Sequence, residues 1–234
     1  MHSDLYSTLS RIDRKTLLLT LHNKANNFSI SSIESINKAL DQVESDSSIK
    51  TLITTGTGKF YSTGLDLKFI ANSPRKITDR FLPDHYHPLL KRVLTMPCWT
   101  VAAVNGYSIA AGMTFALAHD YVLVQKNFGW MCMNEIDLPS PMPAGMSAIL
   151  RCKLLDPSLL RDVLLSGKKL RNGAFIYGEP TENVVDSSAS LAETLEEKCG
   201  KTMRSIKSEL YYEVIDRLNL KDSVPLYDIV RGKL

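Results

Sequence analysis

Two stretches rich in small residues decide the fold: residues 58–67, GKFYSTGLDL, and residues 102–113, AAVNGYSIAAGM. A β-rich run precedes or overlaps each stretch, TLITT at residues 51–55 and TVAAV at residues 100–104. Turn residues close both runs, and helical stretches follow them. Repeated strand–turn–helix units predict an α/β fold with parallel or mixed strand pairing and with functional sites at the ends of the strands.

The rest of the chain extends this alternation in both directions. Ile33, Ile36 and Leu40 recur at helical spacing after Ser32, which is a candidate N-cap. Residues 73–88 hold three prolines and two histidines, and they predict a long irregular or partly helical excursion over a cleft. Apolar residues from residue 190 onward predict amphipathic helices. We further expect strands at residues 16–21 and 121–124, and helices at residues 32–47, 143–155 and 158–166.

Composition excludes several classes of protein. Of the 234 residues, 44% are hydrophobic and 23% charged, which supports a sizeable folded core. No apolar run reaches the ~20 residues of a membrane-spanning helix, so we expect no membrane segment. The net charge of +3 comes from basic and acidic residues mixed along the chain, and no basic face for nucleic acid is predicted. The four cysteines form no Cys-x-x-Cys pair, which predicts reduced thiols and no zinc site.

The two turns share a feature that suits catalysis. Both leave a strand and enter a helix through small residues, so their backbone N–H groups are available to a ligand. Two such turns that converge on one point would supply a pair of donors for an oxyanion. The small residues would let the backbone approach a substrate carbonyl closely. These residues are Gly64, Ala110, Ala111 and Gly112.

Three other motifs fail on spacing or on chain order. Residues 106–110, GYSIA, are close to the Gly-x-Ser-x-Gly elbow of serine hydrolases, but the only later histidine, His119, lies on the same predicted helix. Residues 56–59, GTGK, lack the first glycine and the following Ser or Thr of a phosphate-binding loop. No carboxylate or cysteine cluster accompanies His85 and His87, so we expect solvated loop histidines and no metal site.

Three segments in order and spacing resemble the signature segments of the crotonase (enoyl-CoA hydratase/isomerase) superfamily. They are GKFYSTGLDL, AAVNGYSIAAGMTFALAHDYVLV at residues 102–124, and MNEIDLPSPMPAG at residues 133–145. The pairing of HDYVL with a Met-x-Glu-hydrophobic-Asp segment looks most like the plant-type peroxisomal Δ3,Δ2-enoyl-CoA isomerases. The resemblance implies an α/β crotonase-like ββα spiral core at residues 1–185 and a C-terminal helical region, for packing or oligomerisation, at residues 186–234.

The resemblance also implies a substrate, the residues that bind it and an oligomeric state. The substrate would be an acyl-CoA thioester whose carbonyl oxygen lies between the backbone N–H groups of Leu65 and Ala111. No metal or redox cofactor is implied, because the substrate itself carries coenzyme A. A homotrimer or a homohexamer is implied. Substrate-binding positions in the two turns would be Phe60, Ser62, Gly64, Asp66 and Gly112, of which Asp66 is expected to cap a helix rather than do chemistry.

The acid/base residue distinguishes the possible reactions. Hydratases of this superfamily resemble one another in using two glutamates to handle a water molecule, and Thr114 stands at the first of these positions. Glu135 stands at the second and is the expected catalytic residue, with Asp137 as its rival. A single carboxylate suits a proton shuttle that isomerises 3-enoyl-CoA to trans-2-enoyl-CoA in the degradation of unsaturated fatty acids.

Two alternatives stay open at this stage. One keeps the fold and makes the protein an enoyl-CoA hydratase, or another crotonase-type enzyme, acting on an acyl-CoA thioester. The other is a non-catalytic acyl-CoA-binding relative, because a fold does not guarantee a function.

Three positions depart from the pattern of the superfamily. MPAGM at residues 142–146 replaces the usual Pro-Gly-Ala-Gly-Gly, which implies a differently shaped active-site floor. YGEP at residues 177–180 replaces the usual Gly-Leu-Val, and its proline would interrupt strand pairing. The last residues, Gly232-Lys233-Leu234, share only Lys-Leu with the peroxisomal Ser-Lys-Leu signal, so a peroxisomal and a cytoplasmic location both stay open.

Overall fold

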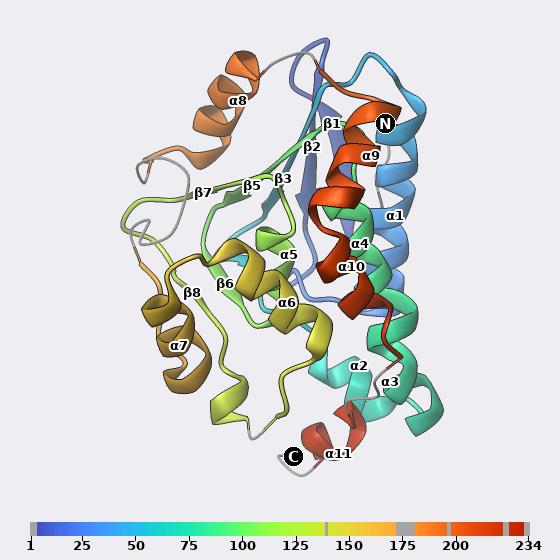
Figure 1. Ribbon diagram of the computed structural model, residues 1–234, viewed down its shortest axis with the longest axis vertical. Coiled ribbons are helices and arrows are strands. Elements are labelled where there is room, and N and C mark those ends of the chain that lie inside the picture. Colours follow the sequence, from blue (N-terminus) through green and yellow to red (C-terminus); the bar gives the residue numbers. More distant parts are fainter. Residues whose placement is uncertain (1–3, 139, 172–180, 196–197, 222–224, 232–234) are drawn as a thin grey trace.

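Two sheets form the framework of the computed structural model, which describes residues 4–138, 140–171, 181–195, 198–221 and 225–231. The larger sheet has the order β1-β2-β3-β5-β7, with β1 antiparallel to β2 and the other pairs parallel (Figure 1). The smaller sheet has the order β4-β6-β8 and is parallel throughout. The strands are β1 (Ser7–Arg11), β2 (Thr16–Leu21), β3 (Thr51–Gly56), β4 (Phe60–Ser62), β5 (Trp99–Val104), β6 (Tyr107–Ile109), β7 (Tyr121–Val124) and β8 (Met131–Cys132). The predicted α/β class with mixed pairing is confirmed.

Helices cover both faces of the larger sheet. On one face lie α1 (Ile30–Ser45) and α4 (His87–Leu94), and on the other lies α8 (Val184–Thr194), which packs on β3, β5 and β7 (Figure 1). Every residue of β3 is buried as a result. A strand covered on both faces reads as a continuous apolar and β-branched run, which is why residues 51–55 were recognisable as a strand.

The helix expected at residues 32–47 begins earlier, at Ile30. Ser29 is its N-cap, and the Ser29 side chain accepts a hydrogen bond from the backbone N–H of Ser32. The Ser32 hydroxyl in turn accepts from the N–H of Ser29 at 2.8 Å. The prediction that Ser32 is the N-cap is therefore wrong: the two serines form a reciprocal capping box, in which Ser32 is the third residue of the helix.

The proline-rich excursion is more regular than its composition indicated. It contains α3 (Arg75–Phe81), a π-helical turn at Leu82–Tyr86 and α4. Pro83 and Pro88 stand near the starts of the π-helical turn and of α4, and the helical backbone continues through both junctions, since Phe81 and Tyr86 have helical φ and ψ. The segment buries His87, so the expectation of a solvated histidine is wrong at that position.

The C-terminal part is helical, as expected. It contains α8, α9 (Lys201–Leu210), α10 (Tyr212–Asn219) and α11 (Leu226–Arg231). Helix α10 packs on α6 (Ala144–Lys153), where a Cβ on Gly145 would lie 2.6 Å from Leu218. That close approach gives a packing reason for the glycine in MPAGM. Helix α11 packs on α2 (Leu67–Asn72) and α3 (Figure 1). The division at residue 185 stays a prediction; it falls in the first turn of α8.

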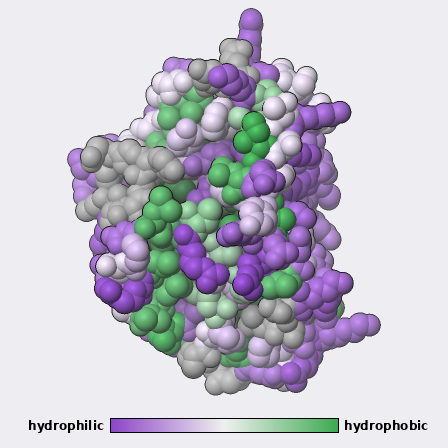
Figure 2. All heavy atoms as spheres, in the orientation of Figure 1, coloured by the Kyte–Doolittle hydropathy of each residue, from purple (hydrophilic) through white to green (hydrophobic). Residues whose placement is uncertain are grey.

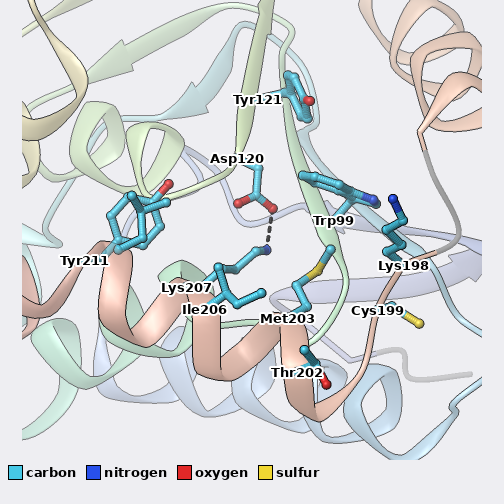
Figure 3. Close-up of a pocket in the computed structure, with 11 residues that line it drawn as sticks. Trp99, Asp120, Tyr121, Lys198, Cys199, Thr202, Met203, Ile206, Lys207 and Tyr211 are labelled. Carbon is cyan, nitrogen blue, oxygen red and sulfur yellow. Dashed lines mark hydrogen bonds and ion pairs between the residues drawn. The ribbon is translucent and has the colours of Figure 1, made fainter.

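A buried ion pair fixes α9 to the strands. Lys207 Nζ lies 2.5 Å from Asp120 Oδ2 and donates to the carbonyl oxygen of Cys98 at 2.8 Å (Figure 3). The same Asp120 oxygen accepts hydrogen bonds from the backbone N–H and the hydroxyl of Thr100. Asp120 thus has a structural role. A cavity of about 620 Å³ opens beside this pair, between α9, Trp99 and Tyr121.

Apolar side chains also reach the surface. Figure 2 shows apolar side chains gathered over the part of the molecule where α7 (Pro157–Ser166) lies. Leu155, just before that helix, and Leu165, in its last turn, are 84% and 69% exposed. Ile206 and Leu210 on α9 are similarly exposed. Among the residues that the structure describes, no helix has the length and apolar character needed to cross a membrane.

Candidate active site

The first turn, after β4, directs the N–H of Leu65 away from its neighbouring segment. Phe28 N–H donates to the Gly64 carbonyl oxygen at 2.8 Å, and Asp66 N–H donates to the Phe28 carbonyl oxygen at 2.9 Å. In this parallel bridge Leu65 stands between the two bonded positions, so its own N–H points to the side opposite Phe28. The role of this N–H as an oxyanion donor stays a prediction.

Two polar side chains hold this turn in place. The Ser62 hydroxyl accepts a hydrogen bond from the Gly64 N–H at 3.1 Å and is fully buried. The Asp66 carboxylate accepts from the Phe69 N–H at 3.0 Å and caps α2. The expectation that Asp66 caps a helix is confirmed. Both side chains act on the protein's own backbone, which positions the donor between them.

The second turn, after β6, contains an unusual backbone conformation. Ala110 has φ 53° and ψ −117°, a region that an alanine rarely adopts. Its N–H donates to the Cys132 carbonyl oxygen of β8 at 2.8 Å, and its carbonyl oxygen accepts from the Thr114 N–H at 3.2 Å. Ala111 is the first residue of α5 (Ala111–Leu117), so its N–H has no acceptor within the helix. The strained residue thus immediately precedes the second predicted donor.

The structure brings the two turns into contact, as the sequence predicted. A Cβ added to Gly64 would lie 2.8 Å from the Ile109 carbonyl oxygen and 3.2 Å from the Ala111 nitrogen. A Cβ added to Gly112 would lie 2.3 Å from the Ser62 carbonyl oxygen. Backbone meets backbone at both places, which only glycine allows. The turns of Leu65 and Ala111 are therefore neighbours across the β4·β6 pair.

Glu135 lies at the end of the third strand of the same sheet. It begins a short 3₁₀ turn, Glu135–Asp137, that follows β8. Within the described part of the chain, its Oε2 is buried and has no hydrogen-bond partner. Burial raises the pKa of the Glu135 carboxyl to about 7, although a hydrogen bond with its own backbone lowers the pKa in part. A carboxyl with such a pKa is suited both to take up and to release a proton near neutral pH.

The rival carboxylate, Asp137, points elsewhere. The two side chains would share a face only in an extended segment, and the 3₁₀ turn separates their directions. Asp137 is exposed, and its Oδ2 lies 3.4 Å from the position of a Cβ on Gly167, at the end of α7. Glu135 and Asp137 therefore do not share a face.

Thr114 stands where two-glutamate hydratases carry their first carboxylate. It is fully buried, and its Oγ1 is 3.1 Å from the Ala111 carbonyl oxygen and 2.9 Å from the Tyr86 hydroxyl. Burial raises the pKa of Tyr86 well above its usual value, and the charge of Glu135 adds to the increase. Tyr86 therefore lies within electrostatic range of Glu135 and within hydrogen-bond distance of Thr114.

The remaining sequence candidates take other places. Phe60 stands at the start of β4, where its ring packs 5.7 Å from that of Tyr107, and its predicted contact with substrate stays a prediction. His119 is buried and shares a hydrogen bond with Thr54 at 3.0 Å, which agrees with the exclusion of a hydrolase triad. No group of three or more potential metal ligands occurs among the described residues. The segments at residues 177–180 and 232–234 lie outside the described residues.

Comparison with known proteins gives this arrangement a context. A family model described as enoyl-CoA hydratase/isomerase matches residues 11–222. The chain belongs to the enoyl-CoA hydratase/isomerase family. Within that family, it is 35% identical over 217 residues to enoyl-CoA delta isomerase 3 of Arabidopsis thaliana, covering 87% of this chain and 91% of the relative. It is 36% identical over 207 residues to the Arabidopsis enoyl-CoA delta isomerase 2, peroxisomal, covering 82% and 86%.

A solved structure supports the assignment of the fold. The human mitochondrial delta3-delta2-enoyl-CoA isomerase superposes with a TM-score of 0.81 at 18% sequence identity, covering 97% of this chain and 91% of the human one. The predicted crotonase-like spiral core with a helical C-terminal region is thereby confirmed. This member of the enoyl-CoA hydratase/isomerase family therefore shares its fold with the human enzyme although only 18% of the aligned residues are identical.

Sequence reasoning missed two residues of this site, Phe28 and Tyr86. Phe28 forms the bridge that orients Leu65, and its ring lies 5.1 Å from that of Tyr86. Neither position carries a motif, since Tyr86 lies in the proline-rich excursion and Phe28 in a short loop before α1. No signal in the sequence distinguishes Tyr86 from Phe81, the other aromatic residue of that excursion.

Proposed function

We propose that this protein isomerises 3-enoyl-CoA to trans-2-enoyl-CoA, with Glu135 as the proton shuttle. The substrate carbonyl oxygen would accept hydrogen bonds from the N–H groups of Leu65 and Ala111. Glu135 would remove a proton from C2, giving a dienolate whose negative charge lies largely on that oxygen, and would return the proton to C4. The double bond thereby moves from C3–C4 to C2–C3, with no net gain or loss of atoms.

One observation carries the choice of isomerisation over hydration. The candidate site carries one carboxylate, Glu135, whose Oε2 is buried, and a threonine, Thr114, at the position where the resemblance implies the first hydratase carboxylate. The Thr114 hydroxyl lies against the Ala111 carbonyl oxygen and the Tyr86 hydroxyl. Neither hydroxyl is a base strong enough to activate water near neutral pH. The names of the Arabidopsis relatives, enoyl-CoA delta isomerases, support the same choice.

The test uses the absorbance of the product. A double bond conjugated with the thioester absorbs in the ultraviolet, so trans-3-hexenoyl-CoA should give rising absorbance when the purified protein is added. Crotonyl-CoA in water serves as the parallel substrate, since loss of its absorbance would indicate hydration. Binding of either thioester without turnover would instead favour a silent acyl-CoA-binding relative.

The pH dependence of the reaction should report Glu135. Because burial raises the pKa of this carboxyl to about 7, the ionised base is lost as the pH falls through that value. We expect kcat/KM for trans-3-hexenoyl-CoA to decrease about tenfold per pH unit below 7 and to level off above it. Initial rates between pH 5 and 9 measure this profile. A kcat/KM that stays constant down to pH 5, as expected of an ordinary glutamate with a pKa of about 4.3, would show that the base of the reaction is not a carboxyl with its pKa raised to about 7.

We further propose that the protein needs no metal or redox cofactor, because the shuttle uses only backbone donors and one carboxylate.

Assembly into a homotrimer or a homohexamer is proposed as well, and the exposed leucines and isoleucines of α7 and α9 support it. Light scattering of the purified protein measures that mass. A peroxisomal location is in line with the names of two Arabidopsis relatives and is tested by imaging the tagged protein.

A further inference from the structure

Tyr86 joins a strained turn to the aromatic core beneath the candidate site. It is fully buried at the end of the π-helical turn Leu82–Tyr86, and single π-helical turns occur often at functional sites. Its hydroxyl donates a short hydrogen bond to the Ala111 carbonyl oxygen. The Thr114 hydroxyl lies within hydrogen-bond distance of both groups. Three oxygen atoms thus form a closed triangle at the first turn of α5.

The backbone next to this triangle is held away from its preferred conformation. Ala110, with φ 53° and ψ −117°, is strained relative to a residue in a preferred region. Rotation of the peptide between Ala110 and Ala111 would relieve that strain, and it would also turn the Ala111 N–H away from the site. Any group that fixes Ala111 therefore opposes the loss of a donor. The carbonyl oxygen of that peptide accepts from the Thr114 N–H, and the Tyr86 hydroxyl bonds to the carbonyl oxygen of the next peptide, that of Ala111, so Tyr86 anchors Ala111 on its C-terminal side.

The same tyrosine also reaches the other turn. Its ring packs 5.1 Å from the ring of Phe28, whose backbone bonds to Gly64 and Asp66 orient Leu65. Phe28 packs in turn on Phe115 of α5 at 5.2 Å. The two donor-bearing turns thus rest on one buried aromatic cluster, and Tyr86 is the member whose hydroxyl bonds to a turn.

We propose that Tyr86 is a positioning residue that keeps the Ala111 N–H aligned for the oxyanion through its hydrogen bond to the Ala111 carbonyl. The expected effect on kcat rests on the proposed function. The expected alignment of the Ala111 N–H does not depend on it. Tyr86 touches no reacting atom in this account. Its removal should impair stabilisation of the enolate and leave the binding of the ground-state thioester largely intact.

The test compares Tyr86→Phe with Tyr61→Phe. Each change deletes one buried hydroxyl from the same cluster, since Tyr61 also packs on Phe115, but the Tyr61 hydroxyl bonds to Thr54 and to neither turn. We expect Tyr86→Phe to lower kcat on trans-3-hexenoyl-CoA about 10- to 100-fold, as small misplacements in a site do. KM should stay within about twofold, because the thioester still binds. Tyr61→Phe should leave kcat unchanged at a comparable melting temperature.

A binding experiment separates this proposal from the proposed function. Calorimetry compares acetoacetyl-CoA, whose enolate places negative charge on the thioester oxygen, with hexanoyl-CoA, which stays neutral. Tyr86→Phe should lower the preference for acetoacetyl-CoA by about the factor lost from kcat, and Tyr61→Phe should leave it unchanged. This ratio needs no turnover, so it tests Tyr86 even if the wild-type protein fails to isomerise the substrate.

Thr114→Val provides a second test if Tyr86→Phe does not fold. It removes the other hydroxyl of the triangle at nearly constant volume, so the preference for acetoacetyl-CoA should fall in the same direction by a smaller factor. The proposal would be overturned if the variants that fold keep the wild-type preference for acetoacetyl-CoA, or if Tyr61→Phe loses as much of that preference as Tyr86→Phe. A higher KM with an unaltered kcat in Tyr86→Phe would overturn it as well.

Discussion

Glu135→Gln should lower kcat for the isomerisation of trans-3-hexenoyl-CoA by about 10²- to 10⁴-fold, the range typical of a lost general base. The amide is nearly the same size as the carboxyl but cannot accept the proton from C2. Burial of Glu135 strengthens this expectation, because little solvent is present to replace the missing base. The thioester should still bind, so KM should change far less than kcat. Absorbance at the wavelength of the conjugated product measures both constants.

Asp137→Asn is the matched control for this change. It also replaces a carboxylate by an amide, two residues along the same 3₁₀ turn, but at an exposed position that faces Gly167. Its kcat should stay within about twofold of the wild type, since surface changes rarely affect a buried site. Full activity in Glu135→Gln together with a large loss in Asp137→Asn would transfer the role to Asp137.

The two turns could be predicted from sequence because their requirement is local. A backbone that must pass another backbone at van der Waals distance needs glycine, and Gly64 and Gly112 show that need directly. Strands of the larger sheet were also recognisable, since burial on both faces leaves continuous apolar runs. The resemblance to the crotonase superfamily, and not these local signals, singled out Leu65 and Ala111 within the two turns.

Features that depend on packing could not be predicted in this way. Tyr86 meets Ala111 across 25 positions of the chain. The N-cap of α1 was misplaced because Ser29 and Ser32 carry the same hydroxyl, and only the backbone angles separate cap from third residue. The regularity of residues 75–94 was missed because prolines in a sequence usually indicate a loop or a helix end, whereas here the helical backbone continues past Pro83 and Pro88.

Gly64→Ala should produce the second large loss, through displacement of an oxyanion donor. The added methyl would lie 2.8 Å from the Ile109 carbonyl oxygen, and Gly64 has φ 86°, which an alanine adopts only with strain. The turns of Leu65 and Ala111 must therefore move apart. Loss of a single oxyanion donor costs about 10²- to 10³-fold in kcat, and we expect a decrease in that range. Initial rates of the absorbance increase with trans-3-hexenoyl-CoA measure this decrease in kcat.

Gly58→Ala separates backbone strain from displacement of the turn. Gly58 has φ 70°, close to that of Gly64, but a Cβ there would meet no atom within 4 Å. Both variants should lose about 1–2 kcal/mol of unfolding free energy to the conformation alone, measured by urea denaturation. Only Gly64→Ala should also lose activity, because only its methyl lies between the two turns. Equal activity in the two variants would mean that the spacing of Leu65 and Ala111 does not limit the reaction, and that the oxyanion is held elsewhere.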